Sequence, residues 1–307
     1  MVPSPVEPSS GQFMLLDVTA WRAGGEEQLG TKPKQWLRDP ADRLWLWKAA
    51  TWNPSPSGEY RKGDDWAERV VTEIARSLDV PVATTELAER AGVFGTVSLS
   101  VLDPESERLV HGNELLAEID VIGSDPHDRS GYSLDAVRRS LEGVAGSVPG
   151  SSAFECLAGY LIVDAVAGNT DRHQENWAVI ENPAAQRRLA PSFDHASSLG
   201  FLLDDAARSE MLHTSDRNQT PEAWAGRART RFEGRAHPVE IAAAAIDMIG
   251  PDVSGAYLEP LEQLDLRRIV ARVPEFRISE PAREFASRVA EANRARILSH
   301  LTRTMDP

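Results

Sequence analysis

The 307-residue sequence has very little cysteine and very little lysine. Its single cysteine, Cys156, excludes an intrachain disulfide and a zinc site built from several thiolates. Only four of the 33 basic residues are lysines, and all four lie in the first 62 positions: Lys32, Lys34, Lys48 and Lys62. The formal net charge is −14, and an acidic surface repels phosphate backbones, so non-specific nucleic-acid binding is not expected.

Long apolar runs are also missing. The most apolar stretch covers residues 153–167, about 15 residues, whereas a membrane span needs roughly 20. Residues 1–10 are rich in proline and serine and lack the pattern of a signal peptide, which predicts a flexible tail. The chain length and 41% apolar content favour two lobes. We therefore expect a two-lobed protein, without a membrane span, in the cytoplasm.

The hydrophobic pattern changes near residues 105–112. Before this point, short apolar runs predict strands over 13–18, 44–49, 93–102 and, as a return strand, 108–111, with a polar turn over 24–34 and a loop over 53–63. One helix is predicted over 64–78, because its apolar residues share a face. After this point the predicted helices cover 133–141, 152–167, 221–232, 238–249, 258–273 and 281–304. We expect an α+β protein with a small β-rich N-lobe (11–108) and a larger, mostly helical C-lobe (109–307).

The strongest functional pattern follows the buried helix over 152–167. Asp171 and Asn176 lie five positions apart in a polar segment, and Asp194 follows 18 positions later on a predicted hairpin. Phosphoryl transfer from a nucleotide needs a carboxylate to orient the attacking hydroxyl, and an amide oxygen and a second carboxylate to hold Mg²⁺. Asp-x-x-x-x-Asn with a later aspartate has the spacing found in kinases. The pattern therefore indicates a phosphotransferase.

An upstream lysine strengthens this interpretation. Lys48 ends an aromatic strand, and a lysine there can reach the α- and β-phosphates of a nucleotide. Such a lysine usually pairs with a carboxylate on a neighbouring helix. Glu68 and Glu73 both lie beside the buried face of the predicted helix, and either can serve as the partner.

Taken together, these segments resemble the HipA-like family of bacterial serine/threonine kinases, which is related in fold to phosphatidylinositol 3/4-kinases. The resemblance rests on four stretches: 44–48, 68–81, 167–180 and 189–199. It implies a two-lobed kinase-like fold, with ATP and Mg²⁺ bound between the lobes and a Ser or Thr hydroxyl of a protein or peptide as acceptor.

The resemblance also implies a role for each site residue. Asp171 is the catalytic base, Asn176 and Asp194 hold Mg²⁺, and His173 lies in the catalytic loop. Lys48 contacts the phosphates, with Glu68 as the favoured partner. Ser100, Val101 and Leu102 form the hinge that meets adenine, and the loop containing Gly30 and Thr31 lies on the phosphate side.

The sequence departs from relatives in three ways. It leaves no room for the extra N-terminal subdomain of full-length HipA toxins, which implies a short form. Asn169 and Thr170 precede the catalytic aspartate, where eukaryotic protein kinases have His-Arg. The loop around Gly30 contains no Gly-x-Gly-x-x-Gly.

Several alternatives stay open at this stage. The acceptor can be a small molecule or lipid headgroup, the fold can serve as a nucleotide-binding pseudokinase, and the acceptor peptide can be a biosynthetic precursor. His173 and His195, with an aspartate, can be read as a metal site, although no His-x-x-x-His is present. Arg227, Arg229, Arg231 and Arg235 form either a solvated helix face or a basic patch for an acidic or phosphorylated ligand.

Overall fold

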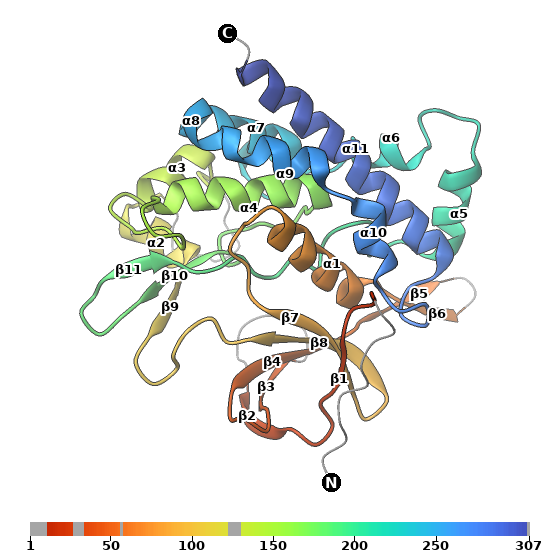
Figure 1. Ribbon diagram of the computed structural model, residues 1–307, viewed down its shortest axis with the longest axis horizontal. Helices are drawn as coiled ribbons and strands as arrows, with labels where there is room; N and C mark the ends of the chain where they lie inside the picture. Colours follow the sequence, from red (N-terminus) through yellow and green to blue (C-terminus); the bar gives the residue numbers. More distant parts are fainter. Residues whose placement is uncertain (1–10, 27–33, 56–57, 122–129, 306–307) are drawn as a thin grey trace.

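The computed structural model describes residues 11–26, 34–55, 58–121 and 130–305. Its N-terminal part is built on a six-stranded sheet with the spatial order β1-β7-β8-β4-β3-β2, seen below the helices in Figure 1. The strands are β1 (Leu15–Asp17), β2 (Arg22–Glu26), β3 (Lys34–Arg38), β4 (Leu44–Ala49), β7 (Thr85–Arg90) and β8 (Val93–Leu99). β1 pairs in parallel with β7, and the other neighbours are antiparallel.

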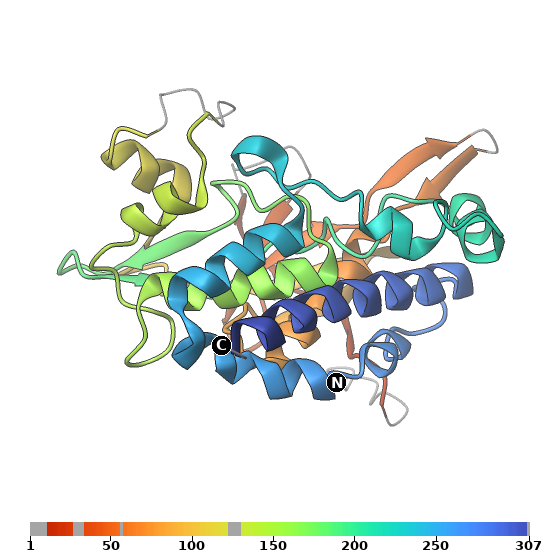
Figure 2. The same cartoon turned by 90° about the horizontal axis from the view of Figure 1, so that it is seen from above.

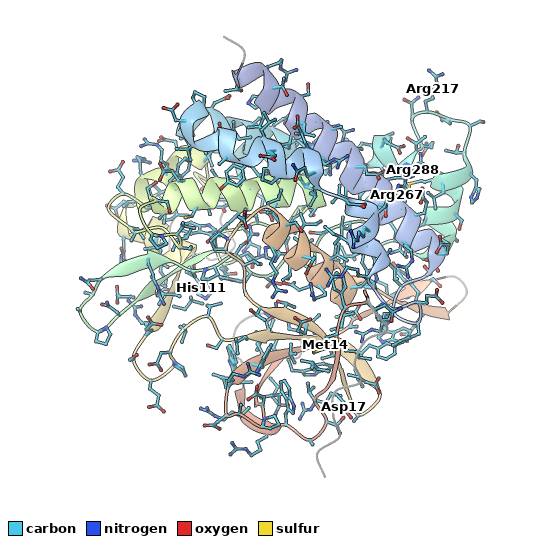
Figure 3. All side chains as sticks on the ribbon, viewed as in Figure 1. Met14, Asp17, His111, Arg217, Arg267 and Arg288 are labelled. Atoms are coloured by element: carbon cyan, nitrogen blue, oxygen red, sulfur yellow. The ribbon has the colours of Figure 1, made fainter. Side chains whose placement is uncertain are left out.

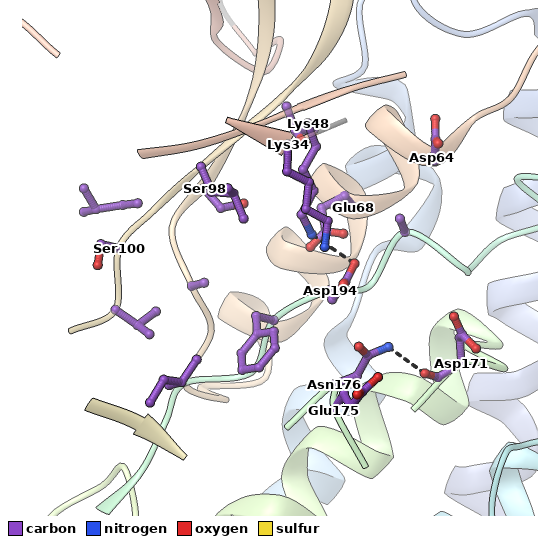
Figure 4. Close-up of a pocket in the computed structure, with 18 of the residues that line it drawn as sticks. Lys34, Lys48, Asp64, Glu68, Ser98, Ser100, Asp171, Glu175, Asn176 and Asp194 are labelled. Carbon is purple, nitrogen blue, oxygen red and sulfur yellow. Dashed lines mark hydrogen bonds and ion pairs between the residues drawn. The ribbon is translucent and has the colours of Figure 1, made fainter. Parts of the chain in front are cut away.

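One helix, α1 (Asp64–Ser77), packs against β7 and β8. Two aspartates in its first turn and Arg76 in its last turn complement the helix dipole. Its apolar face, including Val70 and Ile74, is fully buried. The predicted helix over 64–78 is therefore confirmed. The face beside this apolar stripe carries Glu68 toward the region between the lobes, as shown in Figure 4.

A second sheet links the lobes. β9 (Arg108–His111), β10 (Ala178–Glu181) and β11 (Arg187–Leu189) form an antiparallel sheet with the order β11-β10-β9. The predicted hairpin of residues 177–180 and 189 onward is confirmed. The prediction that 108–111 returns along 93–102 is wrong, because β9 pairs with β10 and not with β8.

The C-terminal part is mostly helical. Figure 2 shows α4 (Ala153–Ala167), α7 (Pro238–Ile249) and α11 (Glu280–Met305) running beside one another, and these three helices contact each other extensively. Ser152 caps α4: Glu155 N donates to Ser152 Oγ at 3.2 Å, and Ser152 N donates to the Glu155 carboxylate at 2.6 Å. Almost every residue of α4 is buried, so it is the central helix of this part. The other helices are α2 (Gly112–Glu118), α3 (Leu134–Ser140), α5 (Asp205–His213), α6 (Pro221–Ala225), α8 (Pro251–Ser254), α9 (Leu258–Gln263) and α10 (Leu266–Ala271).

A buried arginine ties the two parts together. Arg277, in the loop before α11, is fully buried and pairs with Asp65 of α1 at 2.6 Å. Its remaining donors bond the carbonyl oxygens of Ala88 in β7 and Gly95 in β8. A charge removed from water in this way is tolerated because each of the three guanidinium nitrogens donates at least one hydrogen bond. This contact fixes the position of α1 and the sheet relative to the helical part. The site lies between these two parts.

The α+β, two-lobed kinase-like architecture is confirmed, but several element boundaries were wrong. The helix predicted over 221–232 ends at Ala225, and Gly226 follows it. The helix over 258–273 is two helices, because Leu264 is extended and Asp265 caps α10. The loop over 53–63 contains a hairpin, β5 (Trp52–Ser55) with β6 (Gly58–Arg61). The strand over 93–102 stops at Leu99, and part of the turn over 24–34 belongs to β2.

The arginines of the surface mainly serve ion pairs. Arg288 pairs with Glu222, and Arg267 pairs with Glu284 and Glu291, at the positions labelled in Figure 3. Exposed pairs of this kind contribute little stability individually. Among the described residues, no helix combines the length and apolarity that a membrane span requires.

Candidate active site

A cavity of about 1060 Å³ lies between the sheet and the helical part. This volume is at the upper end of the range of small-molecule sites, about 300–1,000 Å³. Its walls come from β3, β4 and β8, from α1, from the segment after β8, and from two loops of the helical part (Figure 4). Nearly all of the predicted site residues in the described chain line it: Lys48, Glu68, Ser100, Leu102, Asp171, His173, Asn176 and Asp194.

The loop over 169–176 is shaped by an ionic network beneath it. Gly168 ends α4 in the left-handed conformation, with φ of 65°. Arg172 is almost fully buried and donates two hydrogen bonds to Asp164 of α4, at 2.7 and 2.8 Å. Asn169 Nδ2 also donates to Asp164, at 2.8 Å, and the Asn169 side-chain oxygen accepts from Asp171 N at 3.0 Å. The network therefore fixes the backbone that presents Asp171.

Arg172 also connects the two loops of the site. Its Nη1 donates to the carbonyl oxygen of Asn176 in the first loop, and to that of Phe193 at 3.0 Å in the second. Burial lowers the pKa of a guanidinium, but the adjacent Asp164 outweighs this effect, so the pKa of Arg172 is raised and it stays charged. One buried cation thus sets the position of Asp194 relative to Asp171 and Asn176.

Asp171 and Asn176 face the cavity from the same loop. Asn176 Nδ2 donates to the Asp171 carbonyl oxygen at 2.7 Å, as drawn in Figure 4. Its Oδ1 accepts no hydrogen bond from the part of the chain that the structure describes, so this oxygen can serve as a metal ligand. His173 lies between them, where its Nδ1 accepts from Glu175 N at 3.1 Å.

Asp194 meets Lys48 across the cavity. Lys48 Nζ donates to Asp194 Oδ1 at 3.0 Å. Asp194 has a φ of 59°, a conformation that aspartate tolerates better than most residues. Burial lowers the pKa of Lys48, but the charges of Asp194 and Glu68 outweigh burial and raise it above its usual value. Lys48 is therefore a fully protonated cation at neutral pH.

Glu68 and Glu73 have different surroundings. Glu68 is almost fully buried and lines the cavity, and its Oε2 accepts from His195 N at 2.9 Å. Burial raises the pKa of Glu68, but the hydrogen bond from His195 and the charge of Lys48 outweigh burial and lower it. Glu73 instead bonds Arg69 at 2.9 Å and Arg272. Of the two candidates, Glu68 is thus the one that acts on Lys48.

His195 belongs to the packing behind the site. It is fully buried, and its Nε2 lies 2.8 Å from Ser192 Oγ. Within the described ranges, no group of three His, Cys, Asp or Glu side chains is placed to hold a metal ion, so the His/His/Asp alternative finds no site there. Cys156 is buried in α4, as expected for a packing residue.

The described lysines gather at this cavity. Lys34, Lys48 and Lys62 all line it. Lys34 of β3 lies directly opposite Lys48 of β4, and Figure 4 shows both side chains on the cavity side. Like charges at opposed positions repel, and a bound polyanion would relieve this repulsion. The few lysines of the sequence that the structure describes therefore concentrate their positive charges at one site.

The segment after β8 lines the opposite end of the cavity through Ser100, Val101 and Leu102. Ser100 N donates to the Leu44 carbonyl oxygen at 2.9 Å, and Ser100 Oγ donates to that of Leu102 at 2.9 Å. These bonds hold the segment as an ordered wall. Gly30 and Thr31, expected on the phosphate side, lie outside the described residues, as does Lys32.

The arginines after α6 do not lie on an α-helix, and Arg235 ends a short 3-10 helix over Glu233–Arg235. Arg231 Nε donates to Asp171 Oδ1 at 2.8 Å, whereas Arg227 and Arg229 donate to the carbonyl oxygens of Asn218 and Ala228. The solvated-helix alternative is therefore wrong, because α6 ends at Ala225 and Arg227, Arg229 and Arg231 follow in turns and irregular backbone. Sequence reasoning did not find the contact of Arg231 with Asp171, nor the Asp164–Arg172 pair.

Comparison with known proteins identifies the family. A family model described as the HipA-like C-terminal domain matches residues 27–253. The chain belongs to this family. No curated protein matches the sequence.

Solved structures support the same fold. A Helicobacter pylori proinflammatory kinase, CtkA, is similar with a TM-score of 0.69 and 17% identity, over 95% of this chain and 99% of that chain. HipA from a Shewanella oneidensis MR-1 toxin–antitoxin complex is similar with a TM-score of 0.53 and 13% identity, over 93% of this chain and 66% of that chain. At these identities the likeness shows a kinase-like fold, and together with family membership it supports a phosphotransferase.

Proposed function

We propose that this protein is an ATP- and Mg²⁺-dependent kinase that transfers the γ-phosphoryl group to a Ser or Thr hydroxyl of a protein or peptide. One observation carries the proposal: Lys48 of β4, Asp171 and Asn176 of the loop after α4, and Asp194 after β11 line a single cavity between the lobes. This is the set of groups that phosphoryl transfer requires.

The residues fit a metal–nucleotide complex. Asn176 and Asp194 offer one amide oxygen and one carboxylate, and Mg²⁺ at such sites takes its remaining ligands from phosphates and water. Lys34 and Lys48 supply cationic groups for the phosphates, and the ordered segment with Ser100 and Leu102 would meet adenine. Gly30 and Thr31 are proposed as phosphate-side residues. When bound, ATP would supply the phosphoryl group, and Mg²⁺ would neutralise part of the negative charge of the phosphates.

Asp171 acts on the acceptor. Its carboxylate is partly exposed at the cavity wall, where an acceptor hydroxyl can approach within hydrogen-bonding distance. Arg231 holds Oδ1, so Oδ2 is the oxygen that takes the hydroxyl proton. His173 lies on the same loop, where its backbone N donates to the Asp171 carbonyl oxygen at 2.7 Å and its side chain lines the cavity.

The acceptor class is tested by incubating the purified protein with ATP, Mg²⁺ and a Ser/Thr peptide library, followed by mass spectrometry. The proposal expects phosphoserine or phosphothreonine on peptides or on the chain itself, and none with the Asp194→Asn variant. ATP turnover without a phosphorylated peptide or chain would point to a small-molecule or lipid acceptor. Calorimetric binding of Mg·ATP without turnover would identify a pseudokinase and overturn the proposal.

A further inference from the structure

Arg231 holds Asp171 through only one edge of its guanidinium group. Nε donates to Asp171 Oδ1 at 2.8 Å, and the two residues are 60 positions apart. Nη1 and Nη2 make no hydrogen bond within the described chain, and the side chain is 45% exposed. A guanidinium carries five donors in a rigid plane, so the edge formed by Nη1 and Nη2 can bind an oxyanion while Nε stays on Asp171.

The backbone that carries Arg231 is firmly anchored. Phe232 is buried and stacks on Tyr132, with ring centroids 4.5 Å apart and an interplanar angle of 15°. On the other side, Thr230 donates through both N and Oγ1 to the Ala236 carbonyl oxygen, at 3.0 and 2.8 Å. Arg231 is therefore held between two buried residues, unlike an arginine on a freely moving loop.

The same anchor reaches the catalytic loop. The Tyr132 hydroxyl donates to the Arg172 carbonyl oxygen at 3.2 Å, and Trp177 Nε1 donates to that hydroxyl at 3.1 Å. Glu233 N also bonds the Tyr132 carbonyl oxygen at 2.8 Å. The segment with Arg231 and the loop with Asp171 thus share one buried aromatic support, which fixes the distance between them.

This segment is strongly basic in an acidic protein. Residues 226–237 contain four exposed arginines and a single acid, Glu233, against a net charge of −14 for the whole chain. Arg227, Arg229 and Arg231 are exposed and alternate with the less exposed Ala228 and Thr230. Arg231 does not line the cavity proposed for the nucleotide. It contacts Asp171 from outside that cavity, and we expect the acceptor to approach Asp171 from there.

We propose that Arg231 selects acceptors that carry a negative group, a carboxylate or a phosphate, within two residues of the phosphorylated Ser or Thr. This inference rests on the proposed function, and it assigns that site a substrate class. An acceptor hydroxyl must come within about 3 Å of Asp171. Arg231 lies 2.8 Å from the same carboxylate, and consecutive Cα atoms are about 3.8 Å apart, so the anion belongs to a near neighbour of the acceptor residue.

A peptide array tests the proposal. Each peptide has one Ser or Thr, with neutral, basic, Asp, Glu or phosphoserine residues at the flanking positions. Phosphorylation is compared for the wild type, Arg231→Gln and Arg231→Glu, with Arg235→Gln as the matched control from the same segment. Arg235 is exposed, and its side chain has no hydrogen bond or ion pair within the described ranges. Urea unfolding of all four proteins verifies that they are equally folded.

The wild type should prefer an anionic neighbour within two residues by about tenfold, the value of one charge-assisted bidentate contact. Arg231→Gln should remove most of this preference, Arg231→Glu should favour basic neighbours, and Arg235→Gln should keep the wild-type pattern. The Asp/Glu and phosphoserine arms identify which anion is read. An unchanged preference in Arg231→Gln, or no preference in an active wild type, would overturn the inference while leaving the kinase proposal standing.

Two other results also decide the matter. A higher rate on neutral peptides in Arg231→Gln, without loss of any preference, would show that Arg231 blocks Asp171 instead of reading the acceptor, and it would overturn the inference. A wild type that consumes no ATP under any condition would overturn the proposed function as well. ATP consumption, measured in parallel, therefore separates failure of the inference from failure of the proposed function.

Discussion

Lys48 Nζ and Asp194 Oδ1 lie 3.0 Å apart although 146 residues separate them in the sequence. Lys48 stands on β4 of the N-terminal sheet, and Asp194 follows β11 in the helical part. The pair is sheltered, with side-chain exposures of 16% and 30%, and it spans the cavity between the lobes. The phosphate-side cation and the metal-side acid of the proposed site are therefore in direct contact.

Replacing Lys48 by methionine should weaken Mg·ATP binding by about 10- to 100-fold, because one charge-assisted contact to phosphate is lost. Adenosine has no phosphates, so its affinity should stay the same in titration calorimetry. Arginine at this position should not restore ATP affinity, since a planar guanidinium replaces a compact ammonium. Equal loss of ATP and adenosine affinity would instead indicate a disrupted cavity.

Glu68 should stabilise the fold in a pH-dependent way. Its pKa in the folded protein lies below the usual 4.5, so its ionised form contributes fully above pH 4.5 and loses its contribution as the pH falls through the lowered value. Urea unfolding at neutral pH should show Glu68→Gln less stable than wild type by about 1–3 kcal/mol. This difference should shrink as the pH falls below 4.5.

Glu73→Gln is the matched control for Glu68. It removes an acid from the same helix that bonds Arg69 and Arg272 away from the cavity. We expect it to leave Mg·ATP affinity unchanged, whereas Glu68→Gln should reduce it. If Glu73→Gln were the variant that weakened nucleotide binding, the assignment of Glu68 as the partner of Lys48 would be wrong.

The Asp164–Arg172 pair should be essential for the shape of the catalytic loop. Arg172→Met leaves Asp164 as a buried, unpaired charge, which typically costs about 3–5 kcal/mol of unfolding free energy. The double variant Asp164→Leu with Arg172→Met should recover part of this stability but not activity, because Asn176 and Phe193 lose the donor that joins the two loops. Urea unfolding and ATP turnover measure the two effects separately. Full activity in the double variant would show that the pair has no positioning role.

Much of this architecture follows from local sequence. The apolar spacing of α1, the capped apolar helix α4 and the β10–β11 hairpin are all determined by residues within one element. The Asp171–Asn176 spacing could also be recognised in the sequence, because both residues lie on one short loop. Lys48 was conspicuous because lysine is rare in this chain. Local periodicity and composition therefore predicted the two-part α+β architecture and pointed to Lys48, Asp171, Asn176 and Asp194, whereas the kinase-like fold and the other site residues came from the family resemblance.

The missed features depend on contacts between distant elements. Apart from Glu155 in the first turn, Asp164 is the acid of the apolar helix α4, and a buried charge requires a partner. The sequence therefore contained a signal for this pair. The partner of Asp164, however, is fixed only by the fold of the following loop. The helix predicted over 221–232 failed because Thr230 and Phe232 are buried by tertiary contacts at a spacing of two. The contact of Arg231 with Asp171 depends on the course of the chain after Ala225.

The central claim is that Asp171 is the base of an ATP-dependent phosphoryl transfer. It is tested most directly by measuring ATP turnover with Mg²⁺ in wild type and Asp171→Asn, with Asp135→Asn on the exposed face of α3 as control. We predict that Asp171→Asn lowers turnover by about 10²- to 10⁴-fold and keeps Mg·ATP affinity within a few-fold of the wild-type value. The turnover of the Asp135→Asn control should match that of wild type. Wild-type turnover in Asp171→Asn would contradict the account.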